Sequence, residues 1–162
     1  MSKKHILKHT ETEVVLKIYT TESAGESIDI SLENDITKST QSYVTPTSVP
    51  DESSNGLTIP TYTGSRVYIT GLWWGLKKDK QLDITRIITA PDTVHSHYYL
   101  INAGQYEFDH HGFADRIYAH KDFRLVFDGP GHCILKLRKL GWLPKVETAQ
   151  FSVYDNTTQV GS

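Results

Sequence analysis

The chain has 162 residues, which suit one domain that buries its own core. Seventeen Lys and Arg stand against nineteen Asp and Glu, and the formal charge of -2 offers no overall attraction to nucleic acid or to an anionic membrane. The single cysteine, Cys133, excludes an internal disulfide and a thiolate zinc cluster, and it fits a protein made in a reducing cytoplasm.

The chain begins with a polar segment, and we interpret residues 1–12 as an N-terminal arm. This segment lacks the apolar stretch of a signal peptide, and no apolar run approaches the length of a membrane span. We therefore expect neither secretion by a signal peptide nor membrane insertion. Residues 13–20 then alternate apolar side chains with others, which is the pattern of a half-buried strand. Residues 27–33 repeat the pattern after a short turn and predict a first hairpin.

The segment 39–65 is rich in residues that favour loops. It contains three of the six prolines, and 18 of its 27 residues are Ser, Thr, Pro, Asn or Gly. A loop of this length is uncommon inside a compact domain and is usually functional or mobile. We predict a long loop here, which is either a binding segment or a variable insertion.

Strand patterns return at 66–74, 81–88, 95–101, 105–109, 122–128 and 132–140. Successive segments are predicted to pair as hairpins, most clearly around the Gly129-Pro130-Gly131 turn. About eight strands without a long amphipathic helix predict an all-β fold, an antiparallel β-sandwich that is jelly-roll-like. We assign the sandwich to residues 13–142. Residues 143–162 become polar and are interpreted as a C-terminal arm or tail.

The sharpest candidates for chemistry are histidines. His95 and His97 share one face of a strand, and with Glu107 and His132 they could hold a metal ion in a cupin-like enzyme. The spacing departs from the cupin pattern, because Glu107 lies ten residues after His97. We therefore expect no metal site, no cofactor and no catalytic residue, and we interpret the histidines as surface or interface residues. A metal-dependent cupin-like enzyme is the alternative.

Aromatic side chains supply the expected partner contacts. Trp73 and Trp74 are adjacent on a strand and must point to opposite faces, so one of them can reach an interface. Trp142, Phe151 and Tyr154 near the C-terminal end are the other expected contacts.

The run from 136 to 145 carries four cations without an acid, and with its tryptophan it could form a nucleic-acid stripe. Cations on an edge strand also protect it from aggregation, and the balanced overall charge argues against strong phosphate affinity. We expect no nucleic-acid partner.

The order of the segments KKHILKHTETE, VVLKIYT, ESIDISLEN and DFRLVFDGPGHCILKLRKLGWL resembles the capsid decoration, or cement, proteins of tailed bacteriophages and related small virion structural proteins. In that class a first strand often runs into an "IDLS" strand, and the chain ends with a glycine turn and an "ILELRK"-like strand. The resemblance covers residues 3–38 and 66–142. The insertion at 39–65 and the tail after Pro144 depart from it.

This resemblance implies a β-sandwich that binds the outer surface of a phage capsid, commonly as a homotrimer, and reinforces contacts between major capsid protein subunits. The implied partners are the phage major capsid protein and further copies of the chain. The implied location is the capsid surface of the virion, after synthesis in the host cytoplasm. A carbohydrate-binding jelly-roll module is a further interpretation, and it requires a coplanar set of aromatic rings on one sheet face.

Overall fold

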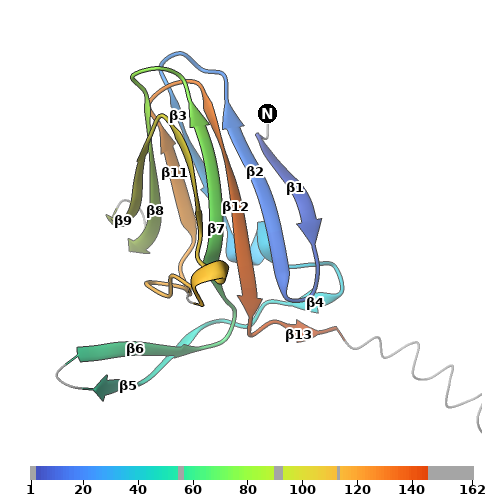
Figure 1. Cartoon of the computed structure of the whole chain (residues 1–162). Coiled ribbons are helices and arrows are strands. Elements are labelled where there is room, and N and C mark those ends of the chain that lie inside the picture. Colours follow the sequence, from blue (N-terminus) through green and yellow to red (C-terminus); the bar gives the residue numbers. More distant parts are fainter. Residues whose placement is uncertain (1–2, 55–56, 90–92, 113, 146–162) are drawn as a thin grey trace, which may run out of the picture.

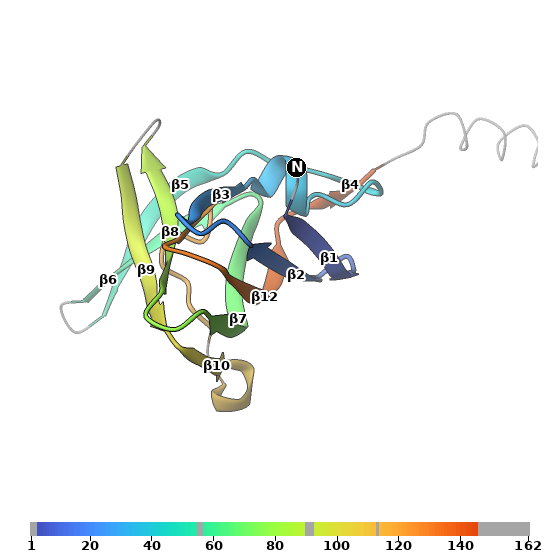
Figure 2. The same cartoon turned by 90° about the horizontal axis from the view of Figure 1, so that it is seen from above.

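The computed structural model describes residues 3–54, 57–89, 93–112 and 114–145. Two antiparallel sheets lie face to face (Figures 1 and 2). The strands are β1 (Lys4–His9), β2 (Glu13–Thr20), β3 (Glu26–Ile30), β4 (Gln41–Ser42), β5 (Thr47–Ser54), β6 (Leu57–Thr63), β7 (Arg66–Leu76), β8 (Gln81–Thr89), β9 (Thr93–Ile101), β10 (Ala103–Glu107), β11 (Phe123–Phe127), β12 (Gly131–Leu140) and β13 (Leu143–Pro144). Short helical turns are η1 (Leu32–Ile36) and η2 (Asp109–His111). Within the described residues, no helix has the length and apolar character needed to cross a membrane.

Eight strands pair in the nested order of a jelly roll. β2 pairs with β12, β3 with β11, β7 with β10 and β8 with β9. In sequence order, the first of these eight strands therefore pairs with the last, the second with the second to last, and so on. Two further pairings complete the sheets β1-β2-β12-β7-β10 and β3-β11-β8-β9. The predicted antiparallel, jelly-roll-like sandwich is confirmed, with thirteen strands among the described residues in place of about eight.

The strand pairs expected as hairpins are wrong. β11 and β12 follow one another around the Gly129-Pro130-Gly131 turn, but β11 pairs with β3 and β8, whereas β12 pairs with β2 and β7. The other three expected hairpins also join strands of opposite sheets. A period-two pattern shows which face of a strand is buried, but the partner strand depends on residues far away in the sequence. Within the two large sheets, the pairs that are consecutive in the sequence are β1–β2 and β8–β9.

The core lies between the two sheets and is closed at one side by η1. It consists of Val14, Leu16, Ile18, Ile28, Ile30, Leu32, Ile36, Val67, Ile69, Leu72, Leu82, Ile84, Leu100, Phe123, Leu125, Phe127, Cys133, Leu135, Leu137 and Trp142. Cys133 is fully buried, and burial raises the pKa of its thiol to about 12. It is therefore a core residue without thiolate character.

Three segments differ from the expected arms and loop. Residues 4–9 of the expected N-terminal arm form β1, the edge strand of the first sheet. The expected loop at 39–65 contains β4 and a hairpin of β5 and β6. The C-terminal segment starts with β13, which pairs with β4, and residues 146–162 lie outside the described residues. Proline and serine in the insertion suggested a loop, although Pro is tolerated in the edge strands that a hairpin supplies.

Candidate functional site

The residues of the alternative metal site are not assembled. His95 and His97 lie on β9, whereas Glu107 ends β10 and His132 lies on β12, and these last two strands belong to the opposite sheet. No group of three or more His, Cys, Asp or Glu able to hold a metal ion occurs in the part of the chain that the structure describes. The arrangement therefore offers no support for the cupin-like alternative.

Each member of that set has neighbours of its own. The Nδ1 of His110 lies 3.3 Å from the Oε2 of Glu107 at the end of β10. The ring of His132 covers Gly75 on β7, where an added Cβ would lie 2.7 Å from the His132 Cε1. His95 makes edge contacts with the rings of His97 and Tyr118.

The carboxylate of Asp115, in the segment after η2, contacts the side chains of His97 and Tyr98 on β9. The Nε2 of His97 lies 3.1 Å from the Oδ2 of Asp115, and the Tyr98 hydroxyl donates to the same oxygen. Burial opposes ionisation of Asp115, but its contact with His97 and its hydrogen bond from Tyr98 prevail and lower its pKa to about 2. Burial, with Asp115 beside it, raises the pKa of Tyr98. At neutral pH the carboxylate is therefore a fixed anion and the phenol stays protonated.

Arg86 on β8 is a fully buried cation near this carboxylate. Its Nη1 donates to the carbonyl oxygen of Lys121 at 2.6 Å, and its Nη2 donates to that of Val67 at 2.9 Å. The guanidinium carbon lies 3.6 Å from the centre of the Phe123 ring. Burial lowers the pKa of Arg86 to about 9, with Asp115 acting in the opposite direction, so the side chain is charged at neutral pH. It joins the segment before β11 to β7.

The expected partner contacts fall into three groups. Trp73 and Trp74 face opposite sides of β7, as predicted: Trp74 packs against the core, and the ring of Trp73 covers Gly71 on the outer face. Trp142 is buried, and its indole N–H donates to Thr37 at 2.8 Å, so it serves its own core and is not a surface contact. Phe151 and Tyr154 lie outside the described residues.

The β5–β6 hairpin, which we call the arm, projects from one end of the sandwich (Figure 1). Its base is held firmly. The ring of Tyr62 stacks on that of His120 with 3.6 Å between centroids, and Ser65 exchanges two backbone and side-chain hydrogen bonds with the main chain of Val44. Gly64 adopts a φ of +87° with no room for a side chain. We call these contacts the arm root.

The imidazole in the arm root is neutral at physiological pH. Burial lowers the pKa of His120 to about 4, and the nearby cations of Lys121 and Arg86 act in the same direction. The stack with Tyr62 therefore joins two neutral rings, and it stays uncharged until the solution becomes strongly acidic.

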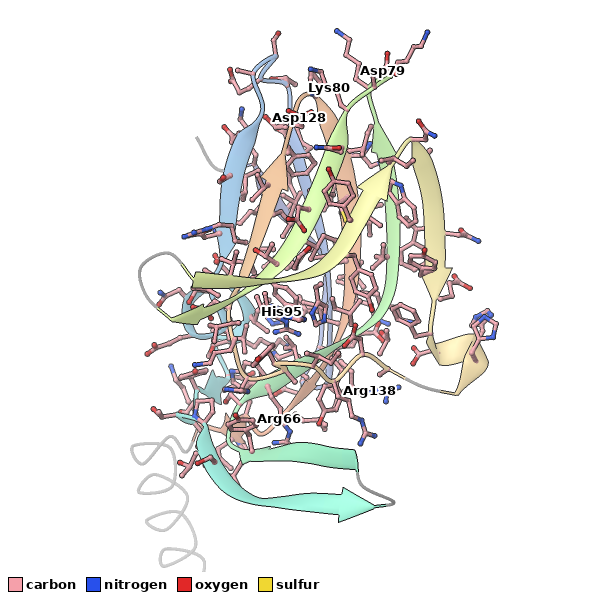
Figure 3. The ribbon with its side chains drawn as sticks, turned by 90° about the vertical axis from the view of Figure 1, so that its left-hand side faces the viewer. Arg66, Asp79, Lys80, His95, Asp128 and Arg138 are labelled. Atoms are coloured by element: carbon pink, nitrogen blue, oxygen red, sulfur yellow. The ribbon has the colours of Figure 1, made fainter. Side chains whose placement is uncertain are left out.

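Beside the arm root, the outer face of the first sheet carries a group of arginines around one tyrosine. The Nε of Arg66 donates to the Tyr68 hydroxyl at 3.1 Å, and the guanidinium of Arg116 lies over the Tyr68 ring at 5.4 Å. On the neighbouring strand β12, Arg138 lies opposite Tyr68, and Leu140 lies opposite Arg66. The Leu140 side chain is 37% exposed. We call Arg66, Tyr68, Arg116 and Arg138 the basic patch. Figure 3 shows Arg66 and Arg138 at the end of the sandwich that carries the arm.

Sequence reasoning missed the arm as an ordered element. The Asn55-Gly56 dipeptide is a strong signal for a two-residue hairpin turn, and it could have identified β5 and β6 within the supposed loop. No comparable signal marks the basic patch or the Arg86 site, because their members come from separate parts of the chain.

Fold and surface together define an all-β jelly-roll protein with a projecting arm. Comparison of the chain with models of protein families, with curated proteins and with solved structures gave no match.

Proposed function

We propose that the protein is a virion structural protein that binds the outer surface of a phage capsid and reinforces contacts between major capsid protein subunits. The observation that carries the proposal is the firmly rooted arm, which stands away from a jelly roll with its own complete core. Jelly rolls are common among viral capsid proteins. The residues of the core all lie outside the arm, which leaves the arm for contact with other molecules.

In this mechanism the protein binds the capsid through a surface that is already ordered before binding. A binding segment whose base is fixed loses less conformational entropy on docking than a free loop does. A specific interface typically buries about 1,600 Å² in total. A capsid repeats the same target many times, so an oligomer that makes several modest contacts gains avidity. No reacting group is required by this mechanism.

A second candidate is a carbohydrate-binding module, and one observation favours it. On the outer face of the first sheet, the Trp73 ring covers Gly71 and the His132 ring covers Gly75, so two rings lie close against the strand. Flat rings can stack on the apolar faces of sugars. Quenching or enhancement of Trp73 fluorescence by soluble glycans, lost in Trp73→Ala, would support this candidate.

Co-sedimentation with capsid shells tests the principal proposal. Shells assembled from the major capsid protein of the phage that encodes the chain are mixed with the purified protein and pelleted. We expect saturable binding at a fixed ratio to the capsid subunit. The arm variant, in which residues 50–60 are replaced by Asn-Gly, should keep its near-ultraviolet circular dichroism and lose the binding. Failure of the unmodified protein to bind mature shells at micromolar concentration would refute the proposal.

A further inference from the structure

We propose that the arm of one copy of the chain docks on the basic patch of a second copy, and that this contact builds the homo-oligomer. This contact would be the surface between copies in the proposed virion protein. It rests on the proposed function in one respect, that the protein forms an oligomer. Binding to a capsid is a separate property with a separate measurement.

The basic patch has an unbalanced charge. The described residues place no carboxylate within ion-pair distance of Arg66 or Arg116. Arg138 does have one, Asp109, but it shares that carboxylate with Lys136, at 2.9 and 3.2 Å respectively. Among the described residues, the three guanidinium groups around Tyr68 therefore have one carboxylate between them, that of Asp109, and Lys136 also pairs with it. Arginine on this kind of surface favours carboxylate ligands and stacks on aromatic rings.

The arm has the complementary charge. In the sequence from 47 to 63 the ionisable acids are Asp51 and Glu52, and the segment contains neither Lys nor Arg. It also supplies apolar residues, Val49, Leu57 and Ile59, that suit the exposed Leu140 at the border of the basic patch. Opposite charges on two surfaces guide encounter and fix their register.

The arm also needs a partner for its own stability. β5 and β6 form a two-stranded sheet that pairs with neither large sheet. An isolated hairpin of this kind is marginally stable in water. The arm root fixes where the hairpin starts, and its strands extend beyond the sandwich (Figure 1). A surface on another molecule is therefore the natural support for its outer part.

The positions of arm and patch favour a second copy of the same chain. Both lie at one end of the sandwich, whereas Asp79 and Lys80 lie at the opposite end (Figure 3). Copies arranged around a rotation axis can place each arm on the patch of the next copy. Such a head-to-tail contact closes into a ring when the rotation is a whole fraction of a turn. A trimer satisfies this condition.

Light scattering coupled to size exclusion tests the contact by charge exchange. Arg116→Glu with Arg138→Glu reverses two exposed members of the patch, and Asp51→Lys with Glu52→Lys reverses the arm. We expect the unmodified protein to be an oligomer and each double variant to fall to the monomer mass of 18.3 kDa. The quadruple variant, which carries all four changes, should regain the oligomer because the charges are again complementary.

The matched control is Lys77→Glu with Lys78→Glu, which reverses two exposed cations between β7 and β8, at the opposite end, and should leave the mass unchanged. Raising the salt from 0.05 to about 1 M should weaken the unmodified oligomer, because screening shortens the range of the attraction. A monomeric unmodified protein, folded double variants that remain oligomeric, or a folded quadruple variant that stays monomeric would each overturn the inference. An oligomer that fails to bind shells would instead refute only the capsid proposal.

Discussion

The backbone of Gly141 packs directly against the carbonyl group of Gly64, closely enough that a Cβ on Gly141 would collide with it. Gly141 also has a φ of +85°, a conformation that L side chains rarely adopt. The hydroxyl of Ser65 donates to the Gly141 carbonyl oxygen at 3.3 Å, so the turn after β12 forms part of the support of the arm root.

Gly141→Ala should therefore destabilise the protein strongly, by more than about 3 kcal/mol, because it adds a backbone collision to the cost of a positive φ. Gly112→Ala is the matched control. Gly112 has a φ of +76° but no atom within 4 Å of its would-be Cβ, so only the conformational cost of about 1 kcal/mol remains. Urea unfolding measures both values. Equal losses in the two variants would contradict the close contact between Gly141 and Gly64.

Arg86 should be essential for stability although it belongs to neither the arm nor the basic patch. Arg86→Met leaves the carbonyl oxygens of Val67 and Lys121 buried without their donor, and we expect a loss of about 3 kcal/mol or more in the free energy of unfolding. The exposed pair of Arg124 and Asp29, 2.8 Å apart, provides the comparison. Arg124→Met should cost less than about 1 kcal/mol. A similar cost for both substitutions would argue against the role of burial.

Acid should weaken the arm root through His120. The folded protein holds the pKa of this imidazole at about 4, below the ordinary 6.5, so the unfolded chain binds the proton more readily. The contribution of His120 to stability is fully present above pH 6.5 and is lost as the pH falls toward 4. Because water screens this half-buried imidazole, we expect a loss well below the ~3 kcal/mol of the full pKa difference. His120→Phe keeps a flat ring beside Tyr62 and should flatten this part of the curve of stability against pH.

The control for that experiment is the unmodified protein, measured in the same series of buffers. An unchanged slope in His120→Phe would show that other groups cause the acid sensitivity.

At alkaline pH, the free energy of unfolding should depend on the buried Lys139. Its Nζ lies 3.0 Å from the Nε2 of His9 and 2.5 Å from the Oε1 of Gln41, and burial lowers its pKa to about 8. Between pH 8 and 10.5 the folded protein loses this proton while the unfolded chain retains it, so the Lys139 contribution to stability rises with pH. Burial raises the pKa of Cys133, which acts oppositely above pH 9, so the useful quantity is a difference.

That difference is the stability of the unmodified protein minus that of Lys139→Met, measured by urea unfolding across the alkaline range. We expect a constant offset from lost hydrogen bonds below pH 8 and an increasing advantage for the unmodified protein above it. A difference that is independent of pH would contradict a lowered Lys139 pKa.

The residues that the sequence predicted correctly are those whose environment is local. The alternation of apolar residues within 122–128 and 132–140 puts Leu125 and Phe127 on one face of the first strand and Cys133 and Leu135 on one face of the second, and all four are buried. Strand partners were not predictable in this way, since β11 and β12 follow one another in the sequence yet enter different sheets. A nested order of pairs emerges only from the packing of the whole chain.

The candidate metal set shows the same limit. Alternation put His95 and His97 on one face, but the register between β8 and β9 shifts so that His97 has no cross-strand partner, and it turns to Asp115. The Asp115 contact depends on residues 18 positions away, which no local pattern specifies. The arm, in contrast, carried a local signal in its Asn55-Gly56 dipeptide.

Electron cryomicroscopy of phage particles purified from cells that express the chain tests the proposed role at the capsid surface. We expect density for jelly-roll domains on the outer surface of the shell, repeated at equivalent lattice positions, with the arm of each copy on the basic patch of a neighbouring copy. A shell whose outer surface carries no such density, with the chain absent from the particle, would contradict it.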